Sequence, residues 1–130
     1  MYRLIQIKEH GDERGKLYVL ENQKQIPFDI KRIFYISGVK NGESRGNHAN
    51  LNSQFVLICV AGTCKIEIDL GKKKEIVVLD RADKGLYLAP NVWKRMYDFS
   101  EGAVLLVVSD TEYLAEDYIY DYEEYLKSLS

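Results

Sequence analysis

Residues 54–79 read QFVLICVAGTCKIEIDLGKKKEIVVL. The stretch holds three runs rich in valine, isoleucine and other strand-forming residues, and the turn sequences Ala61-Gly62 and Leu70-Gly71 lie between them. Runs of this length, bounded by glycine and small or polar residues, are typical of β-strands joined by turns. The stretch therefore predicts consecutive strands with no helix between them.

The same alternation of short apolar runs and turn sequences continues on both sides of this stretch. Turn signals such as Asn41-Gly42 and the segment 100–102 separate the runs. Because closely spaced strands without intervening helices form sandwiches or barrels, we predict an all-β fold, an antiparallel double-sheet jelly roll or small barrel. The expected strands cover residues 2–8, 16–20, 30–37, 54–60, 64–70, 75–79, 85–88, 94–99 and 103–109.

A helix is expected only at the C-terminus, over about residues 115–129. Its aromatic and apolar positions recur at steps of three and four, with acidic residues early and Lys127 late, as the helix dipole favours. We interpret this stripe as a face that packs against the barrel or a partner subunit rather than as a ligand site. The stripe consists of Tyr118, Tyr122, Tyr125 and Leu129.

Length and composition limit the possible classes of function. The chain has 130 residues, 46% hydrophobic and 29% charged, so we expect one domain, 1–130, with one core. The formal net charge of -2 provides no broad basic field, so no nucleic-acid partner is expected. The longest apolar run, 55–61, is far shorter than the ~20 residues of a membrane span, and the N-terminus has no signal-peptide core. We therefore expect a cytoplasmic protein with no membrane segment.

Cysteine and histidine are scarce, with two of each. Two cysteines cannot form a disulfide framework or a four-thiolate zinc site, and two imidazoles cannot form a three-histidine metal site. The cysteines are Cys59 and Cys64. A hairpin loop at Ala61-Gly62 places them directly opposite on neighbouring strands, whereas a type II′ turn at Gly62-Thr63 does not. In either register we expect two reduced, packed thiols, as is usual in the cytosol.

The segment 45–58, RGNHANLNSQFVLI, is the most informative polar stretch. Because side chains alternate between the faces of a strand, one face here is polar first and apolar afterwards. Such a face suits a strand that lines the mouth of a barrel and then its packed floor, although an exposed loop explains the composition about equally well. The predicted inward face consists of His48, Asn50, Asn52, Gln54, Val56 and Ile58.

Other polar residues lie beside or within the expected strands. Arginine binds phosphate with two parallel hydrogen bonds, so Arg14, Arg32 and Arg45 are compatible with a small anionic ligand, although each arginine alone is more often a surface charge. The segments 34–36 and 90–99 add phenols and an ammonium group. These groups can serve as acid or base where a water-poor cavity moves their pKa toward neutrality.

Several short motifs occur in an order that is more specific than any one of them. They are DERG (12–15), IPFDIKRIFYI (26–36), RGNHA (45–49), GLY (85–87), VW (92–93) and MYDFS (96–100). Together they resemble the sugar-nucleotide 3,4-ketoisomerases, single-domain cupins that act on dTDP-4-oxo-6-deoxyglucose. The resemblance extends from about residue 5 to about residue 125.

The resemblance implies a cupin-type antiparallel jelly-roll barrel with a short C-terminal helix. It also implies a homodimer with exchanged N-terminal strands and a dTDP-linked oxo-deoxy-sugar in each barrel, with no metal and no cofactor. In that family the keto group moves between sugar carbons 4 and 3 through an enediol, which makes a precursor of 3-amino-3,6-dideoxy sugars for surface polysaccharide such as lipopolysaccharide O-antigen. The reaction needs a base that moves a proton between adjacent carbons and a donor that polarises each oxygen in turn.

The resemblance further implies roles for individual residues. His48 matches the first histidine of the family's His-x-His pair, and Tyr35 matches a tyrosine that assists proton transfer at the sugar oxygens. We therefore predict that both are catalytic. The predicted substrate-binding residues are Arg14, Arg32, Arg45, Asn50, Gln54, Trp93, Lys94 and Tyr97.

The sequence departs from the family pattern within the site itself. The second histidine of the pair, which the resemblance implies is the carbon-to-carbon proton shuttle, is Asn50 here, and an amide is not a base at neutral pH. Gln54, Lys94 and Tyr97 replace a glutamate and two histidines. Metal-binding cupins place three histidines and a glutamate at His48, Asn50, Gln54 and Lys94. One remaining imidazole beside an ammonium group predicts no metal.

Three interpretations remain open. In the first, the chain is a ketoisomerase in which His48 is base or acid, Tyr35 donates a proton and Asn50 holds a sugar oxygen. Lys94 supplies the missing base if burial lowers its pKa, or binds phosphate as a cation. In the second, the chain is a non-catalytic homologue that binds a sugar nucleotide. In the third, it is an epimerase or acts on another oxo-sugar.

Overall fold

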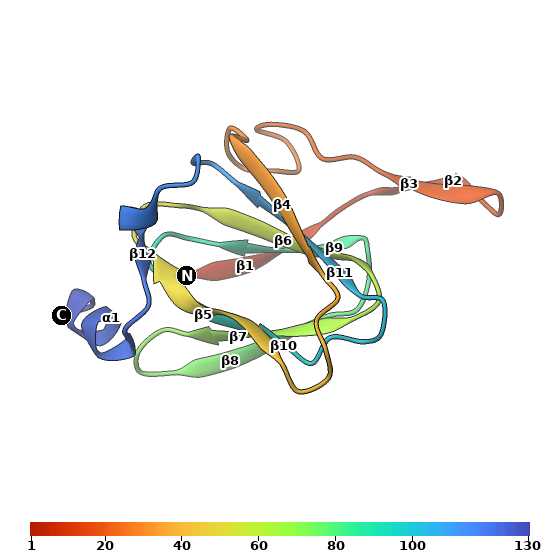
Figure 1. Cartoon of the computed structure of the whole chain (residues 1–130). Coiled ribbons are helices and arrows are strands. Elements are labelled where there is room, and N and C mark those ends of the chain that lie inside the picture. Colours follow the sequence, from red (N-terminus) through yellow and green to blue (C-terminus); the bar gives the residue numbers. More distant parts are fainter.

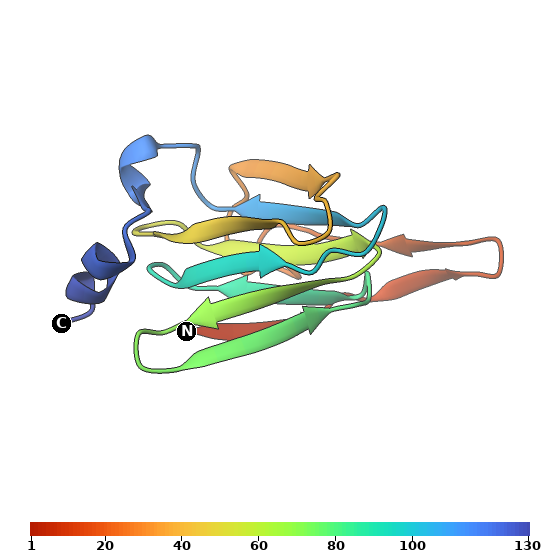
Figure 2. The same ribbon diagram turned by 60° about the horizontal axis from the view of Figure 1, so that its bottom comes forward.

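The chain folds into two antiparallel β-sheets that face one another (Figure 1, Figure 2). The computed structural model describes all of residues 1–130. One five-stranded sheet has the order β1-β9-β6-β11-β4, the other has the order β12-β5-β10-β7-β8, and β2 and β3 form a separate hairpin. The predicted all-β fold is confirmed. The strands are β1 (Tyr2–Gln6), β2 (Glu9–Asp12), β3 (Gly15–Tyr18), β4 (Arg32–Ser37), β5 (Ser44–Asn50), β6 (Phe55–Ala61), β7 (Cys64–Asp69), β8 (Lys74–Leu79), β9 (Lys84–Leu88), β10 (Trp93–Tyr97), β11 (Val104–Ser109) and β12 (Tyr118–Ile119).

Three of these strands were not among the expected ones. β2, β5 and β12 carry few apolar residues or are very short, so they lack the hydrophobic alternation by which strands are recognised in a sequence. β5 matters most for function because it pairs with β10 along one wall of the interior. Its backbone hydrogen bonds, rather than its side-chain composition, make it a strand.

The main core lies between the two sheets. Leu57 and Cys59 of β6 point into it and meet Ile66 and Ile68 of β7. The opposite face of β6 is also buried, because the N-terminal segment that follows β3 packs against it. A strand that is buried on both faces reads as a continuous apolar run, which explains why residues 55–59 show no alternation. The second cluster consists of Ile7, Ile26, Phe28, Val56, Ile58 and Val108.

The predicted hairpin between the expected runs 54–60 and 64–70 is wrong. β6 and β7 lie in different sheets, and the chain crosses from one sheet to the other at Gly62. Gly62 has a φ of 70°, and a Cβ atom there would lie 2.9 Å from the Cα of Ala103, so the crossing requires glycine. A turn sequence between two strands does not reveal whether the strands pair or cross between sheets. Neither predicted register therefore applies.

The two cysteines nevertheless lie close together inside the core. Both are free and buried, and the Cys59 thiol donates a hydrogen bond to the Ala61 carbonyl at 3.2 Å. A hydrogen bond with Cys59, together with burial, raises the pKa of the Cys64 thiol. The reduced state of the pair in the cell stays a prediction.

The C-terminal segment is less helical than expected. A 3-10 turn, η1 (Ala115–Asp117), and β12 precede the only α-helix, α1 (Tyr122–Ser128). The helix begins late because Asp121 caps it, accepting hydrogen bonds from the backbone N–H groups of Glu123 and Glu124. Tyr122 and Tyr125 form the predicted packing face, whereas Tyr118 lies in β12 and faces a cavity. No helix has the length and apolar composition needed to span a bilayer.

Candidate active site

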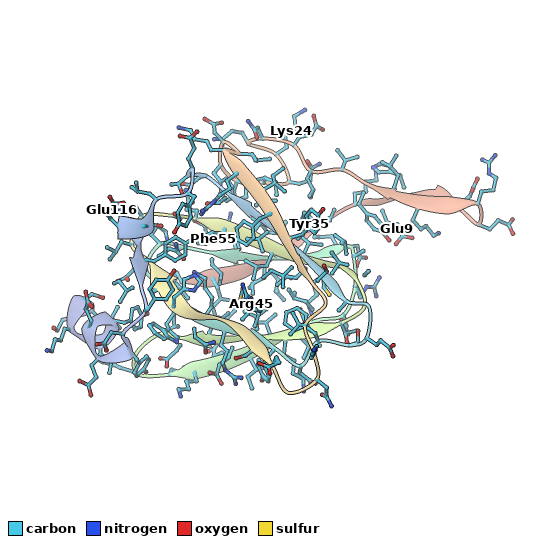
Figure 3. The ribbon with its side chains drawn as sticks, in the orientation of Figure 1. Glu9, Lys24, Tyr35, Arg45, Phe55 and Glu116 are labelled. Carbon is cyan, nitrogen blue, oxygen red and sulfur yellow. The ribbon has the colours of Figure 1, made fainter.

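A cavity of about 570 Å³ lies between the two sheets. Strands β4, β5, β6, β10 and β11 supply most of its wall, and the C-terminal segment adds three tyrosines. Figure 3 shows Tyr35, Arg45 and Phe55 within the double-sheet body, whereas Glu9 lies out on the β2–β3 hairpin. A concave, partly apolar site with a few convergent polar groups is typical of small-molecule binding. The polar lining residues are Tyr35, Ser44, Arg45, Asn47, His48, Lys94, Tyr113, Tyr118 and Tyr120.

His48 and Lys94 lie directly opposite each other on β5 and β10. Both side chains point into the cavity, and opposed residues on antiparallel strands have Cβ atoms about 4.5–5.5 Å apart. A β-bulge follows this pair, since Arg95 pairs with Gly46 and leaves Asn47 unpaired with a φ of 58°. Gly46 allows the close approach, because a Cβ atom there would lie 3.1 Å from the Lys94 carbonyl oxygen.

The Lys94 side chain is only 4% exposed and forms part of the cavity floor. Its Nζ donates a hydrogen bond to Oδ1 of Asn50 at 2.7 Å and lies 4.5 Å from the ring centre of Phe55. The aromatic face and the amide oxygen both favour a cation, but neither replaces the hydration that the ammonium group loses.

Asp117 holds Asn50 from the side opposite Lys94. Asn50 Nδ2 donates to the Asp117 carboxylate at 2.9 Å, and the Ser53 hydroxyl and the Asn52 backbone N–H donate to the same carboxylate at 2.5 and 2.6 Å. Burial raises the pKa of Asp117, but hydrogen bonds from Ser53, Asn50 and Asn52 outweigh it and hold the pKa below its usual value. The carboxylate is therefore ionised and fixes the orientation of Asn50.

Burial shifts the pKa of both facing bases downward. Burial, followed by repulsion from Lys94, lowers the pKa of His48 to about 4. Burial lowers the pKa of Lys94 to about 7, with Asp117 opposing the shift and Arg32 adding to it. At neutral pH His48 is therefore an uncharged imidazole, and Lys94 is present both as amine and as ammonium.

Stacked aromatic rings lie beside His48. The His48 and Tyr118 rings are 4.9 Å apart, and Tyr118 stacks on Tyr120 at 5.7 Å with an interplanar angle of 12°. Tyr113 lies 5.6 Å from Tyr118 on another side. These rings give one wall of the cavity a flat aromatic surface with hydroxyl groups at its edge, which suits a sugar or a nucleobase.

Comparison with known proteins identifies the family. Residues 1–130 match the family model described as FdtA: WxcM-like, C-terminal. The chain is 38% identical over 128 residues to the TDP-4-oxo-6-deoxy-alpha-D-glucose-3,4-oxoisomerase of Aneurinibacillus thermoaerophilus, covering 98% of this chain and 92% of that protein. The chain belongs to the FdtA family. The predicted resemblance to the 3,4-ketoisomerases is thereby confirmed.

Solved structures agree with this family membership. QdtA, a sugar 3,4-ketoisomerase from Thermoanaerobacterium thermosaccharolyticum in complex with TDP, superposes with a TM-score of 0.96 at 39% identity, covering 98% of this chain and 93% of that one. A variant of QdtA with one histidine replaced by asparagine, in complex with TDP-4-keto-6-deoxyglucose, gives a TM-score of 0.96 at 38% identity over the same shares. The 3'-monoepimerase ChmJ from Streptomyces bikiniensis is 16% identical with a TM-score of 0.79, covers 90% of this chain and 67% of that one, and shares the fold alone.

Four of the site residues predicted for this FdtA-family chain line the cavity. His48 and Lys94 form its floor, and Arg45 and Tyr35 lie nearer the solvent. Tyr35 is 70% exposed, so its phenol lies at the rim and not over the floor. Their chemical roles stay predictions.

Asn50 and Gln54 do not lie where the alternation predicted. Asn50 lies behind Lys94, and its amide is engaged by Lys94 and Asp117, so it is not placed to hold a sugar oxygen. The chain turns after Asn50, which breaks the alternation before β6. Gln54 consequently bonds to Asp110 outside the cavity, and Phe55 and Leu57 line it instead of Val56 and Ile58.

Trp93 and Tyr97 also lie outside the cavity. They lie on β10 at odd spacing from Lys94, so the pleat turns them toward the opposite face. Trp93 packs at 5.2 Å from Tyr122, and the Arg95 guanidinium lies 4.0 Å from the ring centre of Tyr97. Their predicted role in substrate binding therefore has no support from this cavity and stays a prediction.

Arg32 and Arg14 do not line the cavity of their own chain. Arg32 lies behind the aromatic wall and donates to the Tyr118 hydroxyl at 3.3 Å. Arg14 lies at the tip of the β2–β3 hairpin, where it pairs with Asp12 at 2.7 Å. Within one chain, therefore, Arg45 is the single member of the predicted arginine set that reaches the cavity.

The sequence reasoning missed the three tyrosines and Asp117. The sequence pattern places Tyr118 and Tyr120 in the expected helix and predicts no role for Tyr113, although half of the chain's ten tyrosines lie between residues 113 and 125. No sequence pattern points to Asp117, because its role depends on a contact with Asn50, which lies 67 positions away in the chain.

The donor chemistry around His48 does not suit a cation. Its polar neighbours on the floor are the Lys94 ammonium and the Asn50 amide. No group of three or more histidine, cysteine, aspartate or glutamate side chains lies in a metal-binding arrangement. The absence of a metal requirement stays a prediction.

Proposed function

We propose that this chain is a TDP-sugar 3,4-ketoisomerase that moves the keto group between carbons 4 and 3 of a TDP-linked 6-deoxyhexose. The supporting observation is the opposed pair His48 and Lys94 on the floor of a cavity whose size suits a sugar. Relatives that match nearly the whole chain are named as enzymes of this reaction. The TDP complex of one relative supports a TDP-sugar as the ligand.

The isomerisation requires proton transfer at two carbons and at two oxygens. The His48 imidazole is uncharged at neutral pH, so it accepts a hydrogen bond or a proton from a sugar hydroxyl. In this proposal the Tyr35 phenol, at the rim of the cavity, donates to the developing alkoxide. Arg45 supplies a cation for the diphosphate.

A homodimer with exchanged N-terminal strands completes this proposal. The β2–β3 hairpin extends away from the body in Figure 2, and its four-residue strands are exposed along their whole length. Leu17 on this hairpin is 57% exposed, so the hairpin is suited to pack on a second subunit. Such packing brings Arg14 to the partner's cavity. Light scattering is expected to give twice the chain mass.

The proposed product places the reaction in a sequence. A 3-keto sugar nucleotide accepts an amino group at carbon 3, so the consuming enzyme is expected to be an aminotransferase. The final product is then a 3-amino-3,6-dideoxy sugar for surface polysaccharide such as lipopolysaccharide O-antigen. We place the enzyme in the cytoplasm on the same basis, since sugar nucleotides are assembled there.

Deuterium exchange tests the reaction directly. Pure protein incubated with TDP-4-oxo-6-deoxyglucose in deuterated water is expected to introduce deuterium at carbons 3 and 4 and to form the 3-keto isomer, followed by NMR. A matched incubation without enzyme measures spontaneous exchange. If high enzyme concentration produces neither exchange nor isomer, the proposal is wrong.

A non-catalytic sugar-nucleotide binder is the second candidate, and Asn50 favours it. The substrate complex of a His-to-Asn variant of QdtA supports the idea that such a site binds substrate. If this chain only binds, Asn50→His is expected to create isomerase activity. If it is an enzyme, wild-type protein turns over and the same substitution is neutral or harmful, because it breaks the contacts of Asn50 with Lys94 and Asp117.

A further inference from the structure

Keto isomerisation between adjacent carbons needs one base that reaches both of them. The cavity floor offers two nitrogen bases, His48 and Lys94, while the amide of Asn50 cannot take a proton at neutral pH. His48 is packed at 4.9 Å from the Tyr118 ring, on a short side chain with two torsions. Lys94 carries its nitrogen on a flexible four-carbon stem that enters the same space.

We propose that Lys94 carries the proton between carbon 3 and carbon 4 in this chain, with Asn50 and Asp117 positioning its amine. The inference rests on the proposed isomerase function and names the base for it. His48 and Tyr35 then serve the two oxygens. The residue that departs from the family pattern, Asn50, becomes the support of the replacement base.

The hydrogen-bond pattern fixes which end of Asn50 meets Lys94. The Asp117 carboxylate only accepts, so it takes the Nδ2 of Asn50 and turns the carbonyl oxygen Oδ1 toward Lys94. Oδ1 then accepts from Nζ at 2.7 Å. A single anchor of this kind holds the amine at the floor and leaves its other protons, or its lone pair, free to face the cavity.

The charges around Lys94 keep a usable population of free amine. The charged and titratable groups that face it are His48 on β5, Asp117 in η1 and Arg32 on β4. Burial and Arg32 lower the pKa of Lys94, whereas Asp117 raises it, and the balance is about 7. A base is most effective when its pKa lies near the working pH.

The proposed step balances without an added reactant. Neutral Nζ takes the proton from carbon 3, the electrons of that bond form the carbon 3 to carbon 4 double bond, and the carbonyl oxygen at carbon 4 takes a proton from Tyr35. The hydroxyl at carbon 3 then loses its proton to the Tyr35 phenolate through His48, and a new carbonyl forms. Carbon 4 of the double bond then takes the proton back from the Lys94 ammonium. Lys94, Tyr35 and His48 thereby return to their starting protonation states, and the product has the same charge as the substrate.

Three lysine variants test the proposal. Lys94→Met removes the base while keeping an unbranched side chain, and Lys94→Arg keeps a cation that cannot act as a base. The control is Lys65→Met, which removes an exposed lysine of the neighbouring strand β7 that pairs with Asp98. We expect kcat to fall by about 10²–10⁴-fold in both Lys94 variants and to stay unchanged in Lys65→Met. Titration with TDP by calorimetry is expected to give similar Kd values for all of them.

The outcomes separate this inference from the proposed function. If wild-type protein isomerises no TDP-oxo-sugar, the proposed function fails; if it does and Lys94→Met keeps more than a tenth of kcat, only the Lys94 assignment fails. If Lys94→Arg keeps the wild-type activity and Lys94→Met loses it, Lys94 acts as a cation for phosphate and the inference is again wrong. Should the variants not fold, as judged by circular dichroism, the deuterium measurement on the wild-type chain described below still decides.

Two measurements use the wild-type chain or a rescued variant. With substrate deuterated at carbon 3 in ordinary water, a lysine returns at most about one third of the label to carbon 4 in a single turnover, because the ammonium carries three equivalent hydrogens. Retention well above one third requires a base with one hydrogen and overturns the proposal. Lys94→Ala is expected to regain activity with added ethylamine but not with added ethanol.

Discussion

Lys94 and Arg14 are both cations near a carboxylate, but they lie in opposite surroundings. Lys94 is 4% exposed on β10, whereas the Arg14 side chain is 88% exposed at the tip of the β2–β3 hairpin. Burial lowers the pKa of Lys94 to about 7 even though Asp117 opposes the shift. A hydrogen bond to Asp12 raises the pKa of Arg14. The exposure of a basic side chain beside a carboxylate therefore decides its protonation state. The exposed group stays a cation, whereas the buried group is partly deprotonated at neutral pH and can act as a base.

This difference separates two regions of the molecule, the buried cavity floor and the exposed β2–β3 hairpin. The cavity floor is packed, and hydrogen bonds link Lys94 through Asn50 to Asp117, which suits a group whose proton affinity must be set by its environment. Both strands of the hairpin are exposed along their length and pair with neither large sheet, which suits a partner contact. Four changes test this contrast, taken from the largest expected effect to the smallest.

Removal of the buried carboxylate is expected to have the largest effect. Asp117→Ala leaves the Asn50 amide and the Asn52 N–H without an acceptor, removes one of the two partners of the Ser53 hydroxyl, and lowers stability by about 3–5 kcal/mol, as for other broken buried charge networks. Urea unfolding measures the change. Glu116→Ala, at the exposed neighbouring position, is the matched control and is expected to change little.

The second effect is a pH dependence of stability that belongs to Lys94. Its folded pKa of about 7 lies below the ~10.4 of an unfolded lysine, so between these values the unfolded chain binds more protons. The free energy of unfolding, taken relative to Lys94→Met, is expected to rise with pH by up to about 1.4 kcal/mol per unit from pH 7 to pH 10. Below pH 7 the burial penalty is present in full and the difference is flat. A difference that falls with pH contradicts the environment described for Lys94.

The third effect concerns the aromatic wall. Tyr118→Phe keeps the ring that stacks on Tyr120 but removes the hydroxyl that accepts from Arg32 at 3.3 Å. We expect a loss of about 1 kcal/mol, measured by thermal unfolding, with TDP-sugar affinity reduced a few-fold. Tyr113→Phe, whose ring lies on the same wall, is the control for a hydroxyl that has no such bond.

The smallest effect on stability is expected at the hairpin. Arg14→Ala removes an exposed ion pair and leaves the unfolding midpoint of the chain unchanged. If the hairpin brings Arg14 to a partner's cavity, the same variant raises the KM for the TDP-sugar. Unchanged KM together with a dimeric mass would show that the Arg14 side chain contributes neither to the site nor to assembly.

The predicted site residues that line the cavity were found from local pattern and from ordered motifs. His48, Lys94, Tyr35 and Arg45 reached the cavity because strand alternation and the family motifs act over a few residues. Gln54, Trp93 and Tyr97 lie outside the cavity because a turn after Asn50 and the pleat of β10 changed which face they occupy. A one-residue shift in a strand exchanges its two faces, so small errors in a boundary move whole side chains out of a site.

By itself, the sequence determined an all-β chain of the 3,4-ketoisomerase family that lacks the second histidine of the site, since composition, turn spacing and motif order are local properties. Only the tertiary structure decided that β6 and β7 lie in different sheets and that Asp117 turns the amide of Asn50 toward Lys94. The physical reason is that proton affinity depends on burial and on contacts between residues far apart in the chain, which no short pattern records.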